Sequence, residues 1–253
     1  PDEVSVVSIM PCVAKKYEVK RKELSQNNIL DTDLSLTVRE LARMIKSAGI
    51  DLENLDEENF DSPLGYSTGA ADIFGVTGGV LEAALRTAYT FVTKEELADD
   101  AIEFKAVRGF DGIKEATINV AGTDVNVVAA SSLGCARKLM DDLRDDIKSG
   151  RKPKYDIIEI MACPGGCVNG GGQPFTNGDY EKVKARGAGL YTIDKNKPQR
   201  KSHENEDIKK LYDEFLGDIG GHNAHKYLHT HYFDKSKIFS KKLKDFSEEC
   251  LNI

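Results

Sequence analysis

A glycine-rich loop with two closely spaced cysteines constrains this chain more than any other feature. The loop reads ACPGGCVNGGG and carries Cys163 and Cys167, directly after the short apolar run YDIIEIM. Glycines at this density let the backbone approach a bound group closely and point amide N–H groups at it. The pattern predicts a strand that runs straight into a ligand-binding loop.

A third cysteine follows a matching strand near the start of the chain. IMPC at 9–12 and IMAC at 160–163 share one pattern, in which an apolar strand ends in Met, a small or cyclic residue and Cys. Cysteines at the carboxyl ends of two strands in one α/β sheet face the crevice where such sheets bind ligands. We therefore expect Cys12, Cys163 and Cys167 to share one site.

Alternating apolar patterns predict an α/β fold with a mixed sheet, flanking helices and a helical or irregular C-terminal tail. We expect strands at about 4–10, 102–108, 117–121 and 125–131 and in YDIIEIM, and helices from Asp33 to Gly49, after Gly79 and from Cys135 to Gly150. We expect the strands at 117–121 and 125–131 to form a hairpin across Gly122. Beyond about residue 178 the composition becomes rich in Lys, Asp, Glu, His and Asn. We therefore divide the chain into a domain at 1–178 and a wrapping tail at 179–253.

The charge balance excludes several classes of function. The 253 residues contain 35 Lys and Arg against 42 Asp and Glu, for a net charge of -7. A nucleic-acid or anionic-membrane binder needs a basic surface, so neither partner is expected. There is no apolar stretch of roughly 20 residues and no basic-then-apolar leader. We expect a soluble cytoplasmic protein.

Five cysteines are too few and too unevenly placed for a disulfide framework. Two buried free thiols are one interpretation of the pair in the loop, and a zinc site is another. Zinc knuckles normally use two similar Cys pairs, whereas Cys12 stands alone. An iron–sulfur cluster fits better, because it is held by thiolates that can be far apart in sequence. We expect Cys135 to be structural and Cys250 to be incidental.

Three segments carry a resemblance to a known family. MPCVAKKYE, PLGYSTGAADIFGVTGGVLEAALR and MACPGGCVNGGGQP resemble, in order, the signature segments of the iron-only (di-iron) hydrogenase large subunit. RKSHENEDIKKLYDEFLG and HKYLHTHY resemble that family's C-terminal tail, which in some members is a separate small subunit. The resemblance covers nearly the whole chain. It implies the C-terminal part of the catalytic domain, hence one lobe of a two-lobed structure, together with its tail.

One family segment is not found in the sequence. Family members carry TSCCPxW, which supplies a cluster cysteine and a neighbouring proton-relay cysteine, and many also carry N-terminal ferredoxin-like domains. An apolar strand pattern also begins within three residues of Pro1. We therefore expect a parent polypeptide that begins upstream, and an isolated chain that is inactive. The partners implied are that missing N-terminal part and ferredoxin or another redox donor.

The resemblance assigns roles to the three cysteines. Cys12, Cys163 and Cys167 match three of the four thiolates that hold a 4Fe-4S cluster, and Cys167 matches the one that also bridges to a di-iron subsite. In the chain alone we expect this cofactor to be absent or incomplete.

Further pocket residues follow from the same resemblance. Lys15 matches a lysine that hydrogen-bonds a cyanide ligand of the di-iron unit, although Lys15 and Lys16 also look like an ordinary solvated pair. Met10 and Met161 match methionines that pack the di-iron pocket, with core filling as the alternative. Pro11, Phe74 and Gly75 are expected to line that pocket. This completes the set of candidate residues near the cluster.

Two other motifs are weaker indications of a binding site. FGVTGG lacks the phosphate-loop pattern, but it opens a helix whose amides could face an anionic cluster. The histidines in HNAHKYLHTH, at 222, 225, 229 and 231, have spacings that a metal could use. No Cys or paired carboxylate completes a metal shell there.

The function expected from the resemblance is reversible interconversion of protons and electrons with dihydrogen. One alternative is a non-enzymatic, hydrogenase-like protein of iron–sulfur assembly, and another is a hydrogenase-like redox or hydrogen sensor. Lys15, the two methionines and STGAADIFGVTGG favour the hydrogenase over the assembly protein.

Overall fold

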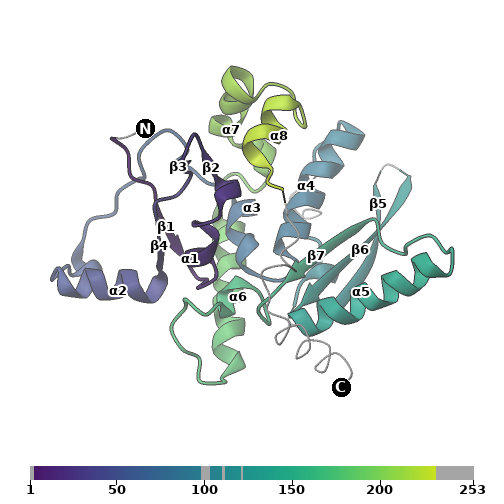
Figure 1. Ribbon diagram of the computed structural model, residues 1–253, viewed down its shortest axis with the longest axis horizontal. Helices are drawn as coiled ribbons and strands as arrows, with labels where there is room; N and C mark the ends of the chain where they lie inside the picture. Colours follow the sequence, from purple (N-terminus) through teal and green to yellow (C-terminus); the bar gives the residue numbers. More distant parts are fainter. Residues whose placement is uncertain (1–2, 98–102, 110–111, 121, 232–253) are drawn as a thin grey trace.

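The computed structural model describes residues 3–97, 103–109, 112–120 and 122–231, which form a mixed α/β fold (Figure 1). The largest sheet contains β5 (Ile113–Val120), β6 (Thr123–Ser131) and β7 (Ile157–Met161). β5 and β6 run antiparallel, and β6 and β7 run parallel, in the order β5-β6-β7. The predicted fold class, a mixed sheet with flanking helices, is confirmed, as is the hairpin before β6.

Helices cover both faces of this sheet. α4 (Gly79–Thr93) packs Leu81 and Leu85 against Val127 and Ala129 of β6. α5 (Leu133–Lys148) lies on the opposite face (Figure 1), where Leu139 packs against the alternate β6 residues. Successive side chains of a strand point to opposite faces, so burial on both sides requires a continuous apolar run. The run VNVVAAS supplies it.

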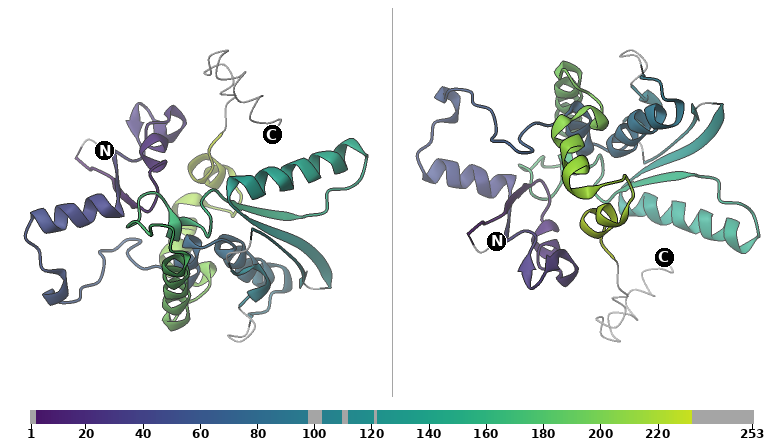
Figure 2. Two further views of the ribbon diagram at one scale, coloured as in Figure 1. Left: turned by 90° about the horizontal axis from the view of Figure 1, so that it is seen from below. Right: turned by 90° about the horizontal axis from the view of Figure 1, so that it is seen from above.

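A second, smaller sheet carries the first cysteine. β1 (Val7–Met10) pairs in parallel with β4 (Leu34–Thr37), in a register that places Met10 opposite Thr37. The connection between them contains α1 (Lys15–Glu18) and the short strands β2 (Ser25–Gln26) and β3 (Ile29–Leu30). α2 (Val38–Ser47) follows β4 and extends away from the rest of the molecule in the views of Figures 1 and 2.

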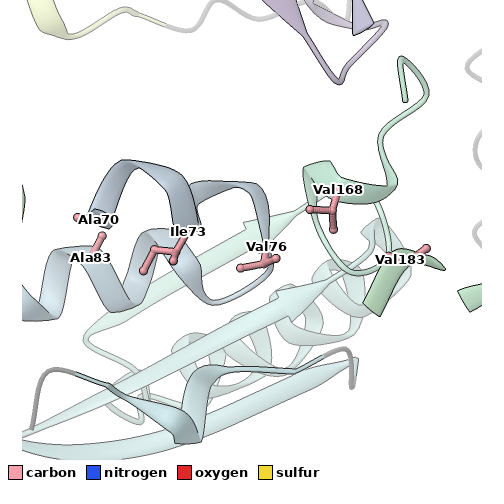
Figure 3. Close-up of a cluster of buried hydrophobic side chains, with 6 residues drawn as sticks. All are labelled: Ala70, Ile73, Val76, Ala83, Val168 and Val183. Carbon is pink, nitrogen blue, oxygen red and sulfur yellow. The ribbon is translucent and has the colours of Figure 1, made fainter. Parts of the chain in front are cut away.

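The C-terminal part contains α6 (Tyr180–Asn196), α7 (Glu206–Leu211) and α8 (His222–Leu228). Of these, α6 packs on the segment before α4. Val183 of α6 joins a buried cluster with Ala70 from α3 (Gly69–Asp72), Ile73 and Val168 (Figure 3). α6 therefore shares its core with the cysteine loop and does not form a separate one.

A buried group of ions joins α4 to α6. Arg86 and Asp194 are fully buried, and the Arg86 guanidinium donates to both Asp194 oxygens at 2.8 and 2.9 Å. Glu82 accepts from Arg86 at 2.7 Å and from Arg108 at 2.7 and 2.8 Å. Paired geometry of this kind compensates the cost of removing each charge from water, so the network fixes α6 on the body of the domain.

Two elements differ from the sequence prediction. The helix expected from Asp33 begins only at Val38, because Leu34–Thr37 forms β4 beside β1, and Thr37 and Glu40 form a capping box at the helix start. The expected strand at 102–108 is wrong, since Lys105–Val107 forms a 3-10 turn; residue 102 lies outside the described residues. Tertiary pairing and packing override local pattern in both places.

The tail contains more helix than expected, because α6 was not predicted.

Among the described residues, no helix is long and apolar enough to cross a membrane.

Candidate metal-cluster site

The Cys163–Cys167 loop begins where β7 ends, at Met161. Gly165 and Gly166 have φ of 85° and 101°, a left-handed region that suits glycine. A Cβ atom on Gly166 would lie 2.8 Å from the Gly75 carbonyl oxygen and from the Thr77 amide nitrogen. The loop is thus packed directly against the backbone that leads into α4, which explains why two adjacent glycines are needed between the cysteines.

The glycine-rich continuation of the loop reaches the first cysteine. The Gly172 amide donates to the Pro11 carbonyl at 2.9 Å, and a Cβ atom on Gly170 would collide with the same oxygen. Because Pro11 directly precedes Cys12, this contact joins the ends of β1 and β7. The two similar strand ends identified in the sequence therefore meet in space.

The Cys167 thiol is affected electrostatically by the other two cysteines. Burial raises the pKa of the Cys167 thiol, the neighbouring Cys12 and Cys163 raise it further, and Lys15 lowers it. Each of the three thiols is half-buried and free of disulfide. A metal cluster needs thiolates, so binding there would release protons from this group.

Polar side chains that sequence reasoning missed hold the loop in place. Ser131, at the end of β6, accepts a hydrogen bond from the Gly165 amide at 2.7 Å. The Thr77 amide donates to the Gly165 carbonyl at 3.2 Å. A serine at the carboxyl end of a central strand is a signal that could have identified Ser131.

Two arginines hold the glycine-rich continuation from outside. Arg39 of α2 donates to the carbonyls of Gly171 at 2.9 Å and Gln173 at 3.2 Å. Arg186 of α6 donates to the carbonyls of Val168 and Pro174 at 3.0 and 2.8 Å. The sequence contains no signal for either arginine, because each is one of several basic residues on its helix.

The amides at the start of α4 bind a carboxyl group of the protein itself. Glu159 of β7 accepts from the Gly78 amide at 2.5 Å and from the Leu81 amide at 2.7 Å. The expectation that the FGVTGG amides face a cluster is therefore replaced by this internal cap. A carboxyl group at a helix N-terminus is favoured by the helix dipole and by the otherwise unpaired N–H groups.

A cavity of about 600 Å³ lies beside Cys167. Pro11 and Gly75 line it, together with apolar residues of α6 such as Leu190. Phe74 does not line it and is 46% exposed. Of these three residues expected to border the pocket, two line the same cavity as Cys167.

The remaining candidates lie around Cys12 and at the end of β7. Met10 and Lys15 line a separate cavity of about 180 Å³, and Lys15 forms an ion pair with Glu18 at 2.5 Å. The Lys15 side chain is 41% exposed, so the structure shows it as a partly solvated lysine close enough to lower the pKa of Cys167. Met161 is half-buried, and its carbonyl accepts from the Ser132 amide at 2.8 Å.

The donor set suits a multi-iron cluster better than a single ion. Three thiols from two loops converge, yet no three Cys, His, Asp or Glu side chains in the described part close around one metal ion. The tail histidines also form no such group in the described part; His225 and His229 instead stack, with ring centroids 4.6 Å apart. Thiols as the ligating side chains are typical of iron–sulfur sites. Cys135 lies on α5, and Cys250 lies outside the described residues.

Comparisons with known proteins show which families this chain resembles. The family model described as iron only hydrogenase large subunit, C-terminal domain, matches residues 1–171, and the iron hydrogenase small subunit model matches residues 180–235. The chain is 48% identical to the NADP-reducing hydrogenase subunit HndD of Solidesulfovibrio fructosivorans, over 94% of this chain and 39% of that protein. It is 54% identical to the periplasmic Fe hydrogenase large subunit of Nitratidesulfovibrio vulgaris, over 76% of this chain and 44% of that protein.

Two further similarities are at lower sequence identity, one to a solved hydrogenase structure and one to a protein with a different name. The solved structure of the FeFe-hydrogenase HydA(deltaEFG) has a TM-score of 0.72 and 38% identity, and covers 92% of this chain and 63% of that one. Protein NAR1 of Arabidopsis thaliana is 31% identical, over 96% of this chain and 53% of that protein.

The fold is an α/β scaffold in which Cys12 and the Cys163–Cys167 loop form a candidate iron–sulfur site. The chain belongs to the iron-only hydrogenase large-subunit family, as the model match over residues 1–171 shows. The resemblance found in the sequence, tail included, is confirmed. The chain spans about two fifths of the length of the two hydrogenase relatives it matches.

Proposed function

We propose that this chain provides the C-terminal part of a catalytic domain that interconverts protons and electrons with dihydrogen. Cys12, Cys163 and Cys167 would hold a 4Fe-4S cluster, with Cys167 also bridging to a di-iron subsite. The observation that carries the proposal is the hydrogen bond from the Gly172 amide to the Pro11 carbonyl at 2.9 Å, which brings the segment of Cys12 to the Cys163–Cys167 loop. In agreement with this, both other cysteines raise the pKa of the Cys167 thiol.

The cluster, when bound, supplies the redox chemistry. The chain's own residues do the rest: the Cys163–Cys167 loop is packed against Gly75 and Thr77, which limits the access of water to one side of the site. Lys15 is a partly exposed cation near Cys167, and we propose that it exchanges Glu18 for an anionic ligand when the cluster is bound. Met10, Met161, Pro11 and Gly75 would give the site an apolar, polarizable border.

We also propose the sources of the missing parts. A fourth thiolate would come from a segment of the TSCCPxW type outside this chain, and electrons from ferredoxin or another redox donor. We propose residues 1–178 and 179–253 as the catalytic part and the small-subunit-like tail. The cytoplasmic location stays a prediction, because one relative is named as a periplasmic hydrogenase.

A second candidate function is that of an iron–sulfur assembly factor. It is favoured by the relatives named cytosolic Fe-S cluster assembly factor, such as one from Xenopus tropicalis that is 30% identical over 95% of this chain. The higher identities to hydrogenases favour the enzyme. In a longer protein that carries TSCCPxW, hydrogen evolution that is abolished by Cys167→Ser supports the hydrogenase. Absence of hydrogen evolution before any substitution supports the assembly factor.

The site itself is tested by anaerobic reconstitution of the 253-residue chain with iron and sulfide. We expect substoichiometric, labile iron binding that becomes more stable when an excess of a small external thiol replaces the fourth ligand. The measurements are iron and sulfide per chain after gel filtration, and the electron paramagnetic resonance signal after reduction. Iron binding equal to that of a triple Cys→Ser variant contradicts the site. A stable, fully loaded 4Fe-4S cluster without added thiol contradicts the missing fourth ligand.

A further inference from the structure

One buried hydroxyl joins the central sheet to the cysteine loop. Ser131 is the last residue of β6 and is 4% exposed. Its Oγ accepts from the Gly165 amide at 2.7 Å and from the Thr77 hydroxyl at 3.4 Å. The hydroxyl therefore lies between the Pro-Gly-Gly turn and the backbone that begins α4.

The turn at Gly165 depends on this junction for its conformation. Gly165 has φ of 85°, so its amide points away from any regular ladder, and a buried amide without a partner is costly. Its carbonyl is held at the same time by the Thr77 amide at 3.2 Å. Both polar groups of this one residue are thus fixed by the pair Ser131 and Thr77, which lies outside the loop.

We propose that Ser131 is a positioning residue for the cluster site, and this rests on the proposed function. By holding the Gly165 amide against the end of β6, it keeps Cys163 and Cys167 oriented toward Cys12. Thr77 orients the Ser131 hydroxyl for this task. Ser131 itself ligates nothing; it acts through the backbone of the loop.

The adjacent residue provides a matched control. Ser132 carries the same hydroxyl one position later, but its Oγ accepts from the Cys135 amide at 3.3 Å and caps α5. Ser131→Ala and Ser132→Ala remove the same group from neighbouring positions. The first removes the partner of the loop, whereas the second removes only a helix cap.

The test compares amide hydrogen exchange in the metal-free 253-residue chain, residue by residue. In Ser131→Ala we expect the Gly165 amide to exchange about fivefold faster, the factor for losing one hydrogen bond, with the Cys135 amide unchanged. Ser132→Ala is expected to show the reverse pattern. Thr77→Val, which keeps the backbone donor, is expected to give a smaller change at Gly165 and serves if Ser131→Ala does not fold. Unchanged exchange at Gly165 in both Ser131→Ala and Thr77→Val overturns the proposal.

Iron binding provides the second readout. After anaerobic reconstitution, Ser131→Ala is expected to retain less than half the iron of the unaltered chain, and Ser132→Ala to retain all of it. Equal iron retention by the two variants overturns the positioning role. If the unaltered chain binds no iron, the proposed function fails and the role fails with it. Normal iron binding with unchanged Gly165 exchange overturns only the role of Ser131.

Discussion

The two strands that end in cysteine lie in very different surroundings. The closed half of the molecule consists of the β5-β6-β7 sheet with α4, α5 and α6, and Val127 to Ala130 of β6 are fully buried there. The open half consists of β1, β4, α1 and α2, where Val7 and Leu34 are 48% and 49% exposed and α2 has no buried residue. The same sequence pattern is therefore supported by a packed core in one half and by a two-stranded sheet in the other.

The difference shows where the cluster site is rigid and where it is adaptable. Cys163 and Cys167 are fixed to the core through Ser131, Thr77 and the glycine packing. Cys12 is fixed through the contact of Gly172 with Pro11 and through the hold of Arg39 on the glycine-rich segment. We infer that the geometry between Cys12 and the other two thiols depends on these contacts of Pro11 and Arg39 with the glycine-rich segment.

The largest expected effect comes from the buried ions of the closed half. Arg86→Met leaves Asp194 and Glu82 buried with incomplete partners and is expected to lower the free energy of unfolding by about 3–5 kcal/mol. Arg144→Met, which removes a 58% exposed arginine paired with Asp141, should cost less than about 1 kcal/mol. Urea denaturation of both variants measures the difference. Equal losses would show that the network adds nothing to the closed half.

A pair of leucines compares the two halves directly. Leu139→Ala removes a side chain of a residue that is 2% exposed from the core under α5, and should cost about 2–5 kcal/mol. Leu34→Ala, at a half-exposed position of β4, should cost about 1 kcal/mol or less. Both are measured from urea denaturation midpoints. A loss for Leu34→Ala as large as for Leu139→Ala contradicts the description of the first half as open.

Two glycines distinguish backbone strain from lack of space for a side chain in the cysteine loop and the segment that follows it. Gly166 and Gly178 both have positive φ, but only at Gly166 would a Cβ meet backbone atoms, whereas Gly178 has open space. Gly166→Ala should therefore cost about 1–3 kcal/mol more than Gly178→Ala. We also expect Gly166→Ala alone to reduce iron binding after reconstitution. Equal stability and equal iron content in the two variants would remove the close packing from the account.

The smallest effect concerns acid and the start of α2 in the open half. The hydrogen bond from Lys16, with those from the Thr37 amide and hydroxyl, lowers the pKa of Glu40 from 4.5 to about 2. The folded form is thus stabilised when Glu40 is ionised, an effect fully present above pH 4.5 and lost as the pH falls toward about 2. Exchange of the Thr37 amide measured from pH 5 to pH 2 should show this loss. Glu40→Gln should abolish the pH dependence, and an unchanged pH dependence in that variant would assign it to another group.

The sequence was sufficient for the features that local chemistry determines. The apolar runs located β6 and β7, and the hairpin that joins β5 to β6 followed from its glycine. The two similar strand ends predicted that the segment of Cys12 would meet the cysteine loop, as the hydrogen bond from the Gly172 amide to the Pro11 carbonyl shows. The sequence was not sufficient where contacts with residues distant in the chain determine the local structure. Leu34 lies in a strand because β1 is beside it, although its spacing fits a helix.

The candidate site shows the same division. The cysteines and the glycines have recognisable spacing, so they could be predicted. Ser131 could have been found from its place at the end of a central strand. Arg39 and Arg186 donate to backbone carbonyls of remote segments, and one basic side chain on a helix gives no sequence pattern from which such a partner can be predicted. The amides at the start of α4 were expected to face a ligand, but they donate to the Glu159 carboxylate of the protein itself.

The most direct test of the central claim is the iron content of two single variants after anaerobic reconstitution of the 253-residue chain. Cys12→Ser removes a thiol of the open half, and Cys135→Ser removes a thiol of the closed half outside the proposed site. If the two halves build one site, Cys12→Ser loses most of the bound iron and Cys135→Ser retains it. Full iron retention in Cys12→Ser would contradict a site shared between the halves.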